Sequence, residues 1–261
     1  MRYLVLFASQ LRASLLVTIQ YRAELAFALV LALVWTAGAL APLLVLYSNR
    51  PHFAGWSWHE SLLVVGWFSV LKGLQSSLIA PSMQEAVMRV RLGTLDFVLL
   101  KPADSQFLIS TTRFELKELS DVVVGLLLLT WAIVRLDQRP TLSASLLAAL
   151  LLVCGVVILY GIWCMVMSLA FVFVKVDNLT YLFASIFDAA RWPAPVFRGV
   201  LAFIFTFVLP LTVMTTFPAL ALRSLISARQ VAGAMIAAAV FIGVSRLVWH
   251  AAVRRYSSAG G

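Results

Sequence analysis

The chain has 261 residues, of which 62% are hydrophobic and 12% are charged. Soluble domains are about half apolar and about a quarter charged. The composition therefore excludes an ordinary soluble protein and predicts an all-α polytopic membrane protein, a single transmembrane domain over residues 1–261. The net charge of +9 does not indicate a nucleic-acid partner, because Lys and Arg stand between apolar segments rather than in one basic stripe.

The N-terminal stretch carries apolar side chains at positions 4, 7, 11, 15 and 19, which is a helical spacing. This pattern predicts an interfacial helix over residues 1–22, lying on the inner membrane surface. The alternative is that these residues begin one long first helix.

Six membrane-spanning helices are predicted, because apolar stretches near the required length of about 20 residues recur along the chain. The second is expected to stop at Pro81, since proline lacks the N–H that a helix uses. Five of the six are placed directly: Leu25–Leu46, Ser61–Ala80, Val122–Val134 with Leu119 adding length, Leu146–Val174 and Val231–Val253.

The sixth span has two interpretations. In one, residues 175–198 form an inner loop and Val200–Leu222 crosses the membrane. In the other, a short span runs from Leu179 to about Trp192, and residues 196–222 dip back into the outer leaflet as a re-entrant pair.

The Lys and Arg residues are biased to one side of the predicted spans, which orients the protein. With the N-terminus inside, the inner segments carry eleven of them when Arg246 is counted with the C-terminal tail, and the outer loops before Lys175 carry three. We therefore expect both termini to face the cytoplasm, at a bacterial inner membrane. The loop interpretation also places Arg191 and Arg198 inside, as the charge bias favours, whereas re-entry places them outside.

The sequence lacks the motifs of common catalytic and metal sites. It has no G-x-x-x-x-G-K-[ST] phosphate loop, no H-E-x-x-H and no carboxylate pair within a span. The three histidines are scattered, so no metal site is predicted. We expect a chain with no catalytic residues and no cofactor of its own, unable to hydrolyse ATP by itself.

The inner loop over residues 82–118 mixes apolar and charged side chains and is longer than neighbouring spans require. Two short helical pieces are predicted, at Gln84–Arg91 and Leu95–Leu100. Gly93 loosens the chain between them, and Pro102 ends the second. A short helix lying flat at the surface suits docking against a cytoplasmic protein; the alternative is an interfacial loop without a partner.

Residues 93–102, GTLDFVLLKP, resemble the G-T-L-[ED]-x-L-L-x-x-P signature of permease subunits in the type-2 ABC exporter family. Residues 55–66 are similar to the corresponding stretch in one branch of this family, whose members are six-span permeases encoded in pairs beside one ATPase. Residues 193–222 are similar to the family's outer re-entrant segment, so the resemblance favours re-entry. The prolines of that segment are Pro193, Pro195, Pro210 and Pro218.

The resemblance implies one half of an ATP-driven exporter. Two nucleotide-binding ATPase subunits would carry ATP and Mg, and a second, related permease would complete a heterodimer in the lipid. The coupling loop, residues 82–104, would rest on an ATPase subunit and transmit its closure to the spans. The residues matching the signature are Gly93, Thr94, Leu95, Asp96, Leu99, Leu100 and Pro102.

Within the coupling loop, apolar residues are expected to form the buried anchor on the ATPase. These are Leu95, Leu99 and Leu100. Basic residues would orient the contact, namely Arg89, Arg91 and Lys101. Asp96 either meets the partner or stabilises the start of the helix.

Lys72 lies near the middle of the second predicted span, where an unpaired ammonium costs at least about 2.5–3.5 kcal/mol. It should therefore face protein or water. Either it lines the path of an anionic or polar substrate, or it pairs with a carboxylate of another span or of another subunit, or it snorkels to the surface.

Two other function classes stay open. A gradient-driven secondary transporter would act without an ATPase, but it needs carboxylates within the membrane, and only Asp188 is expected there. A non-transporting scaffold or sensor would keep the docking loop without a substrate path.

Overall fold

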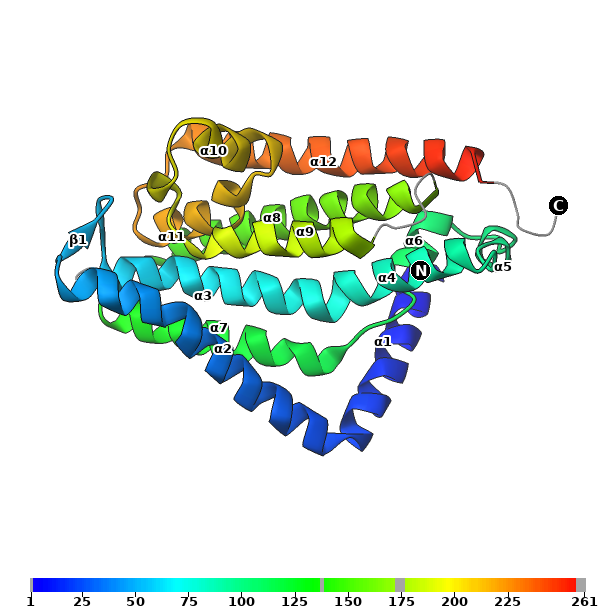
Figure 1. Ribbon diagram of the computed structural model, residues 1–261, viewed down its shortest axis with the longest axis horizontal. Coiled ribbons are helices and arrows are strands. Elements are labelled where there is room, and N and C mark those ends of the chain that lie inside the picture. The colour runs from blue at the N-terminus through cyan, green and yellow to red at the C-terminus, as the bar shows by residue number, and fades with distance from the viewer. Residues whose placement is uncertain (1, 137–138, 172–176, 257–261) are drawn as a thin grey trace.

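The computed structural model describes residues 2–136, 139–171 and 177–256. Nearly all of its regular structure is helical, and the long helices lie side by side along the longest axis (Figure 1). Among the described residues, five helices are long and apolar enough to cross a membrane, or six if a bent pair counts as one span. The expected all-α polytopic membrane fold is confirmed.

The first half of the chain contains α1 (Arg2–Gln20), α2 (Arg22–Ser48), β1 (His52–Phe53), β2 (Trp56–Ser57), α3 (Trp58–Leu74), the π-helix η1 (Gln75–Ile79), α4 (Ala80–Arg91), α5 (Asp96–Leu99) and α6 (Ser105–Ser110). The second half contains the short η2 (Leu116–Glu118), α7 (Leu119–Val134), α8 (Leu142–Ser168), η3 (Leu169–Phe171), α9 (Asp177–Phe187), η4 (Asp188–Arg191), η5 (Ala194–Val196), α10 (Gly199–Phe203), η6 (Ile204–Val208), η7 (Thr212–Thr216), α11 (Phe217–Leu222) and α12 (Ala228–Arg254). The predicted fourth span ends at residues 172–174, which lie outside the described residues.

The second long helix runs without interruption from Trp58 to Arg91, so the prediction that it stops at Pro81 is wrong. A π-helical stretch precedes the proline, which stands near the start of α4. The carbonyl of Ser77, four residues before the proline, accepts a hydrogen bond from the N–H of Glu115 at 2.9 Å. Because another segment supplies the donor that proline lacks, the helix continues. Gln84–Arg91 is thus the end of this long helix, not a separate piece.

Close backbone contacts at glycines fix how the long helices pack. A Cβ added at Gly125 of α7 would lie 2.8 Å from the carbonyl oxygen of Gly66 and 2.8 Å from the nitrogen of Val70, both in α3. Helices α8 and α12 meet similarly: a Cβ at Gly161 would lie 2.9 Å from the carbonyl oxygen of Phe241. Side chains at these glycines would force the helices apart.

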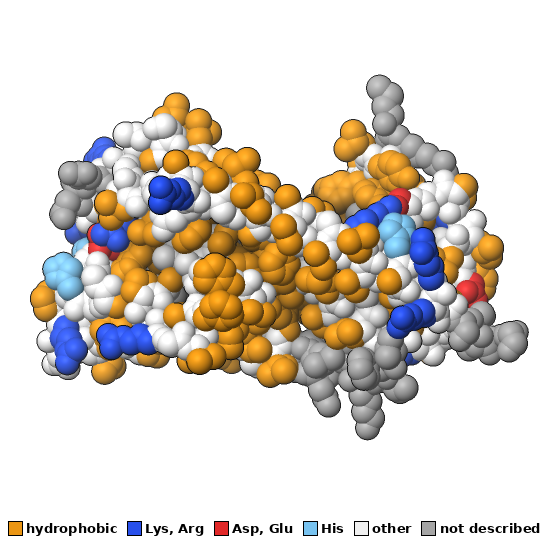
Figure 2. Space-filling model, turned by 90° about the horizontal axis from the view of Figure 1, so that it is seen from above, with side chains coloured by type: hydrophobic (Ala, Val, Ile, Leu, Met, Phe, Trp, Pro, Cys, Tyr) orange, Lys and Arg blue, Asp and Glu red, His pale blue; other side chains and the backbone are white. Residues whose placement is uncertain are grey.

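The polarity of the surface changes along the direction of the long helices. Figure 2 shows hydrophobic side chains across the middle of the molecule, while most of the charged ones in view gather toward its two ends. Strand β1 lies at one end and α5 at the other, and both described chain ends lie toward the α5 end (Figure 1). An apolar band between polar ends is what a lipid bilayer requires.

Helix α1 is separate from α2, because the backbone turns at Tyr21. It is long and apolar enough to cross a membrane, yet Figure 1 shows it running steeply across the direction of the long helices. The structure therefore does not have one long first helix. Of the predicted apolar stripe, Phe7 and Leu11 are half-buried against the protein, whereas Leu4 and Leu15 are exposed.

The ambiguous segment is helical over α9 and η4, where the loop interpretation expects a loop. Two further helical halves, Gly199–Val208 and Thr212–Leu222, are bent by 72° relative to one another, with Pro210 at the bend. Figure 1 shows α10 and α11 at the end of the bundle where β1 lies. A pair bent in this way is either one broken span or a re-entrant loop, so both interpretations of residues 199–222 stay open.

We predict that Gly125→Ala lowers the stability of the bundle by about 1–3 kcal/mol, because the new methyl group overlaps the backbone of α3. Thermal unfolding in detergent measures this. Gly233→Ala in α12 is the matched control, since nothing lies within 4 Å of its added Cβ. Equal melting temperatures for the two variants would contradict the glycine contact.

Candidate functional site

The coupling loop turns between α4 and α5 at Gly93, whose φ of +68° favours glycine. Helix α5 follows, with Asp96 as its first residue, and Lys101 and Pro102 then lead the chain toward α6. The short helix expected near residues 95–100 is therefore present. Figure 1 shows it at the end of the bundle opposite β1.

The side chains of α5 divide between the interior and the surface. Leu95 is 0% exposed and Val98 is 3% exposed, so both belong to the protein's own core. Phe97 is 70% exposed and Leu100 is 81% exposed, and Leu92 beside them is 66% exposed. We call Leu92, Phe97 and Leu100 the α5 apolar face.

The predicted anchor therefore needs a correction. Leu95 is buried inside this chain, and Leu99 is half-buried against the core, so neither points freely toward a partner. Of the three expected leucines, Leu100 alone is exposed. The helix is a single turn, so residue spacing alone did not determine which side faces the bundle.

The expected basic residues differ in their surroundings. Arg91 and Lys101 are exposed beside the α5 apolar face. Arg89 forms an ion pair with Glu85 at 3.2 Å along α4, and its carbonyl accepts the N–H of Thr94 at 3.0 Å. Arg89 therefore stabilises the turn into α5.

An arginine of α12 holds α6 in place. Arg246 Nη1 donates to Asp104 Oδ1 at 2.8 Å and to Gln106 Oε1 at 3.0 Å, while Nη2 contacts Asp104 Oδ2. A guanidinium that meets both carboxylate oxygens forms the strongest kind of protein ion pair. Asp104 Oδ1 also accepts the N–H of Phe107 at 2.9 Å and so caps α6.

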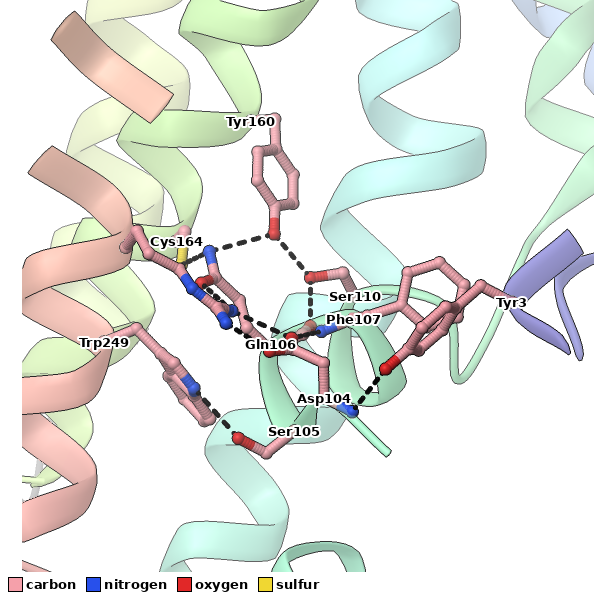
Figure 3. A network of polar contacts seen from close by, with 10 residues as sticks. Tyr3, Asp104, Ser105, Gln106, Phe107, Ser110, Tyr160, Cys164 and Trp249 are labelled. Atoms are coloured by element: carbon pink, nitrogen blue, oxygen red, sulfur yellow. Dashed lines mark hydrogen bonds and ion pairs between the residues drawn. The ribbon is translucent and has the colours of Figure 1, made fainter. Parts of the chain in front are cut away.

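Further hydrogen bonds join α6 to α8. The buried Gln106 side chain donates to Tyr160 Oη at 3.2 Å and to Cys164 Sγ at 3.3 Å. Ser110 and Tyr160 share a hydrogen bond of 2.8 Å. Figure 3 shows these side chains converging on Gln106 between the helices.

Two outer contacts complete the arrangement. Trp249 of α12 donates to Ser105 Oγ at 3.2 Å, and the N–H of Asp104 donates to Tyr3 Oη of α1 at 3.2 Å. The Tyr3 ring also packs edge-on against Phe107, with centroids 4.9 Å apart. We call these contacts of α6 with α1, α8 and α12 the α6 network.

The ion pair of the α6 network stays charged at neutral pH. The hydrogen bond from Arg246 holds the pKa of Asp104 below its ordinary value, although burial acts in the opposite direction. A lowered carboxyl pKa gives a contribution to stability that is lost only as the pH falls through that lowered value. The Asp104 carboxyl is therefore ionised at neutral pH and can pair with Arg246 there.

A second polar site lies among α2, α3, α7 and α9. Lys72 forms an ion pair with Asp121 at 3.7 Å, and Arg191 forms one with Asp188 at 2.9 Å. All four side chains line a cavity of about 570 Å³ whose other wall includes Trp35. We call this cavity the charged crevice. The carboxylate partner that one interpretation of Lys72 required is Asp121 of α7.

The four prolines of residues 193–222 lie before, between and within the two halves of the bent pair: Pro193 and Pro195 precede it, Pro210 lies at the bend, and Pro218 lies at the start of α11. Pro193 and Pro218 are buried and Pro195 is exposed. The Ala194 N–H donates to Thr216 Oγ1 at 3.2 Å, which ties the two sides of the segment together. Among the described residues, no group of three or more His, Cys, Asp or Glu side chains is placed to hold a metal ion.

The α6 network was not predicted from the sequence, although two signals for it exist. Arg246 stands inside the predicted last span, where a cation needs a partner. Asp104 and Ser105 precede an apolar stretch, as helix caps do. Neither signal identifies the other, because the two segments are more than 140 residues apart.

Residues 33–260 match the protein family described as ABC-2 family transporter protein. The chain belongs to this family. No match is found among curated proteins or among solved structures. The match covers α5, the charged crevice and all of the α6 network except Tyr3, and membership implies that this ABC-2 membrane protein works with an ATP-binding subunit.

We predict that Lys72→Gln and Asp121→Asn each destabilise this ABC-2 protein, because each leaves a charge of the crevice without its partner. The double variant should be no less stable than the worse single variant, with a coupling energy of about 1 kcal/mol. Thermal unfolding of the four proteins measures this cycle. Simply additive losses would show that the two groups do not interact.

Proposed function

We propose that the chain is a permease subunit of an ATP-binding-cassette exporter, driven by ATP hydrolysis in a separate subunit. The observation that supports this most directly is the α5 apolar face, on a short helix at one end of the bundle. Exposed apolar groups rimmed by charged ones are typical of protein-binding surfaces. The α5 apolar face would dock on the ATPase, which would hold ATP and Mg, while this chain would hold neither.

The proposed orientation places α5 and both termini on the cytoplasmic side of a bacterial inner membrane. The excess of Lys and Arg in the segments on that side supports it. Export rather than import rests on the family resemblance of residues 93–102 alone.

A second, related permease would complete the membrane part, with two ATPase copies below it. Helix α2 supports this, because it leans away from the bundle and exposes most of its apolar side chains, Trp35 among them. Lipid would cover the remaining apolar surface. We propose a heterodimer because residues 55–66 resemble a branch of the family whose permeases are encoded in pairs.

Helix α1 would lie in the inner interface of the membrane. In support, it crosses the bundle direction and packs on the inner loop over residues 82–118, where the Phe7 and Phe114 rings are 5.5 Å apart. Leu4, Leu15 and Leu16 of α1 are exposed and would face lipid.

The charged crevice would line the substrate path. Its two ion pairs supply both signs of charge inside an otherwise apolar bundle, and ionisable groups at such depth mark transport pathways. A polar group of the substrate would contact Lys72 there.

A gradient-driven secondary transporter remains the alternative. Asp121 and Asp188 in the crevice favour it, because ion coupling needs carboxylates at membrane depth. Transport by the purified chain in proteoliposomes without ATP would support the alternative over the exporter.

We predict that Leu100→Asp prevents copurification of the permease with its ATPase. A charge at the centre of a docking contact weakens binding about tenfold or more. Leu225→Asp is the matched control, since Leu225 is also exposed but lies in the turn after α11. If the Leu100→Asp permease still retains the ATPase, the docking role of α5 is wrong.

The bent pair α10–α11 would be re-entrant from the outer side, which predicts that Arg198 faces outward. A cysteine at position 198 should then react with a membrane-impermeant maleimide added outside intact cells. Ser224→Cys serves as the positive control. Reaction of the Arg198→Cys protein only from the inside would support the loop interpretation instead.

A further inference from the structure

Helix α5 is too short to carry a force into the membrane by itself. It has four residues, and only a few residues separate it from α6. Its inward side chains, Leu95 and Val98, belong to the same core as Leu108 and Ile109 of α6. A push on the α5 apolar face would therefore displace α6 along with α5.

Helix α6 is attached to α12 by two contacts that lie one above the other. Arg246 meets Asp104 and Gln106, and Trp249, one turn further along, meets Ser105. Residues three apart lie on the same side of a helix. Two stacked contacts resist both sliding and rotation of α6 against α12.

The contact with α12 differs in strength from the other attachments of α6. Its contacts with α8 and α1 are hydrogen bonds between neutral groups, through Tyr160, Cys164 and Tyr3. The contact with α12 includes a two-pronged ion pair, and the planar guanidinium fixes its geometry. A displacement of α6 is therefore transmitted to α12 through an ion pair, in addition to the packing of α6 on α4 and its hydrogen bonds to α8 and α1.

We propose that Asp104 and Arg246 form a latch that makes α5, α6 and the last membrane helix move as one unit. The two are positioning residues: they touch neither nucleotide nor substrate, and they connect the docking helix to α12. The part of this inference that concerns ATPase coupling rests on the proposed function, whereas the mechanical link is a property of the permease alone.

The latch can be separated from the helix cap that Asp104 also forms. Asparagine caps helices about as well as aspartate, so Asp104→Asn retains the bond from the Phe107 N–H and loses the charge. Arg246→Gln removes the cation from the other side, and Arg246→Lys restores the charge without the two-pronged geometry. Glu115→Gln is the control, because it breaks an exposed ion pair with Arg113 in the same inner segment.

The first experiment uses the permease alone, with spin labels on Lys101→Cys and Arg254→Cys. Both positions are exposed, and both native cysteines are buried. Double electron–electron resonance should give a narrow distance distribution for the parent and for Glu115→Gln. Asp104→Asn and Arg246→Gln should each broaden it, and their combination should broaden it no further. Unchanged widths, or equal broadening in Glu115→Gln, would overturn the latch.

The second experiment uses the permease bound to its copurified ATPase. Asp104→Asn and Arg246→Gln should reduce stimulation of the ATPase by the permease about five- to tenfold while leaving copurification intact. Arg246→Lys should recover a substantial part of the stimulation. Stimulation within about twofold of the parent in Asp104→Asn would overturn the latch and leave the docking proposal standing.

The failures of the two proposals are distinguishable. If the parent permease binds no ATPase, the proposed function fails, and the distance measurement still decides whether α5, α6 and α12 are one unit. If Asp104→Asn does not yield folded protein, comparison of Arg246→Gln with Arg246→Lys decides: recovery by lysine supports the latch, and equal loss in both overturns it.

Discussion

The ion pair between Arg246 and Asp104 is the contact on which the α5 end of this fold depends. An arginine within an apolar helix requires a partner, and Asp104 supplies it from the segment that also carries α5. The ion pair therefore joins the coupling loop to α12, the last membrane helix. The hydrogen bond from Arg246 also lowers the pKa of Asp104, so the ion pair loses its charge only in acid.

The helix packing makes this attachment mechanically useful. Helices α3 and α7 approach to backbone contact at Gly66 and Gly125, and α8 and α12 do so at Gly161. Close backbone packing leaves little room for small adjustments between neighbours. A displacement of α12 is therefore passed to α8 rather than absorbed by side-chain rearrangement, and the long helices respond together.

Much of the fold could be predicted from sequence, because membrane helices obey strong length and polarity rules. The short helix after Gly93 was also predictable, from its glycine and proline boundaries. The continuation past Pro81 was not, because the hydrogen bond that compensates for the proline comes from Glu115, a residue remote in sequence. The α6 network and the Asp121 partner of Lys72 depend on similar long-range contacts. Their polar residues were visible, but the pairing was not.

The central claim is that the α5 apolar face meets a nucleotide-binding protein in the cytoplasm. Photo-crosslinking in living cells tests it most directly, with a benzophenone amino acid placed in turn at Phe97, Leu100 and Leu225. The account predicts that positions 97 and 100 crosslink to a protein carrying a phosphate-binding loop, and that position 225 does not. Crosslinks from positions 97 and 100 only to lipid or to an extracytoplasmic protein would contradict it.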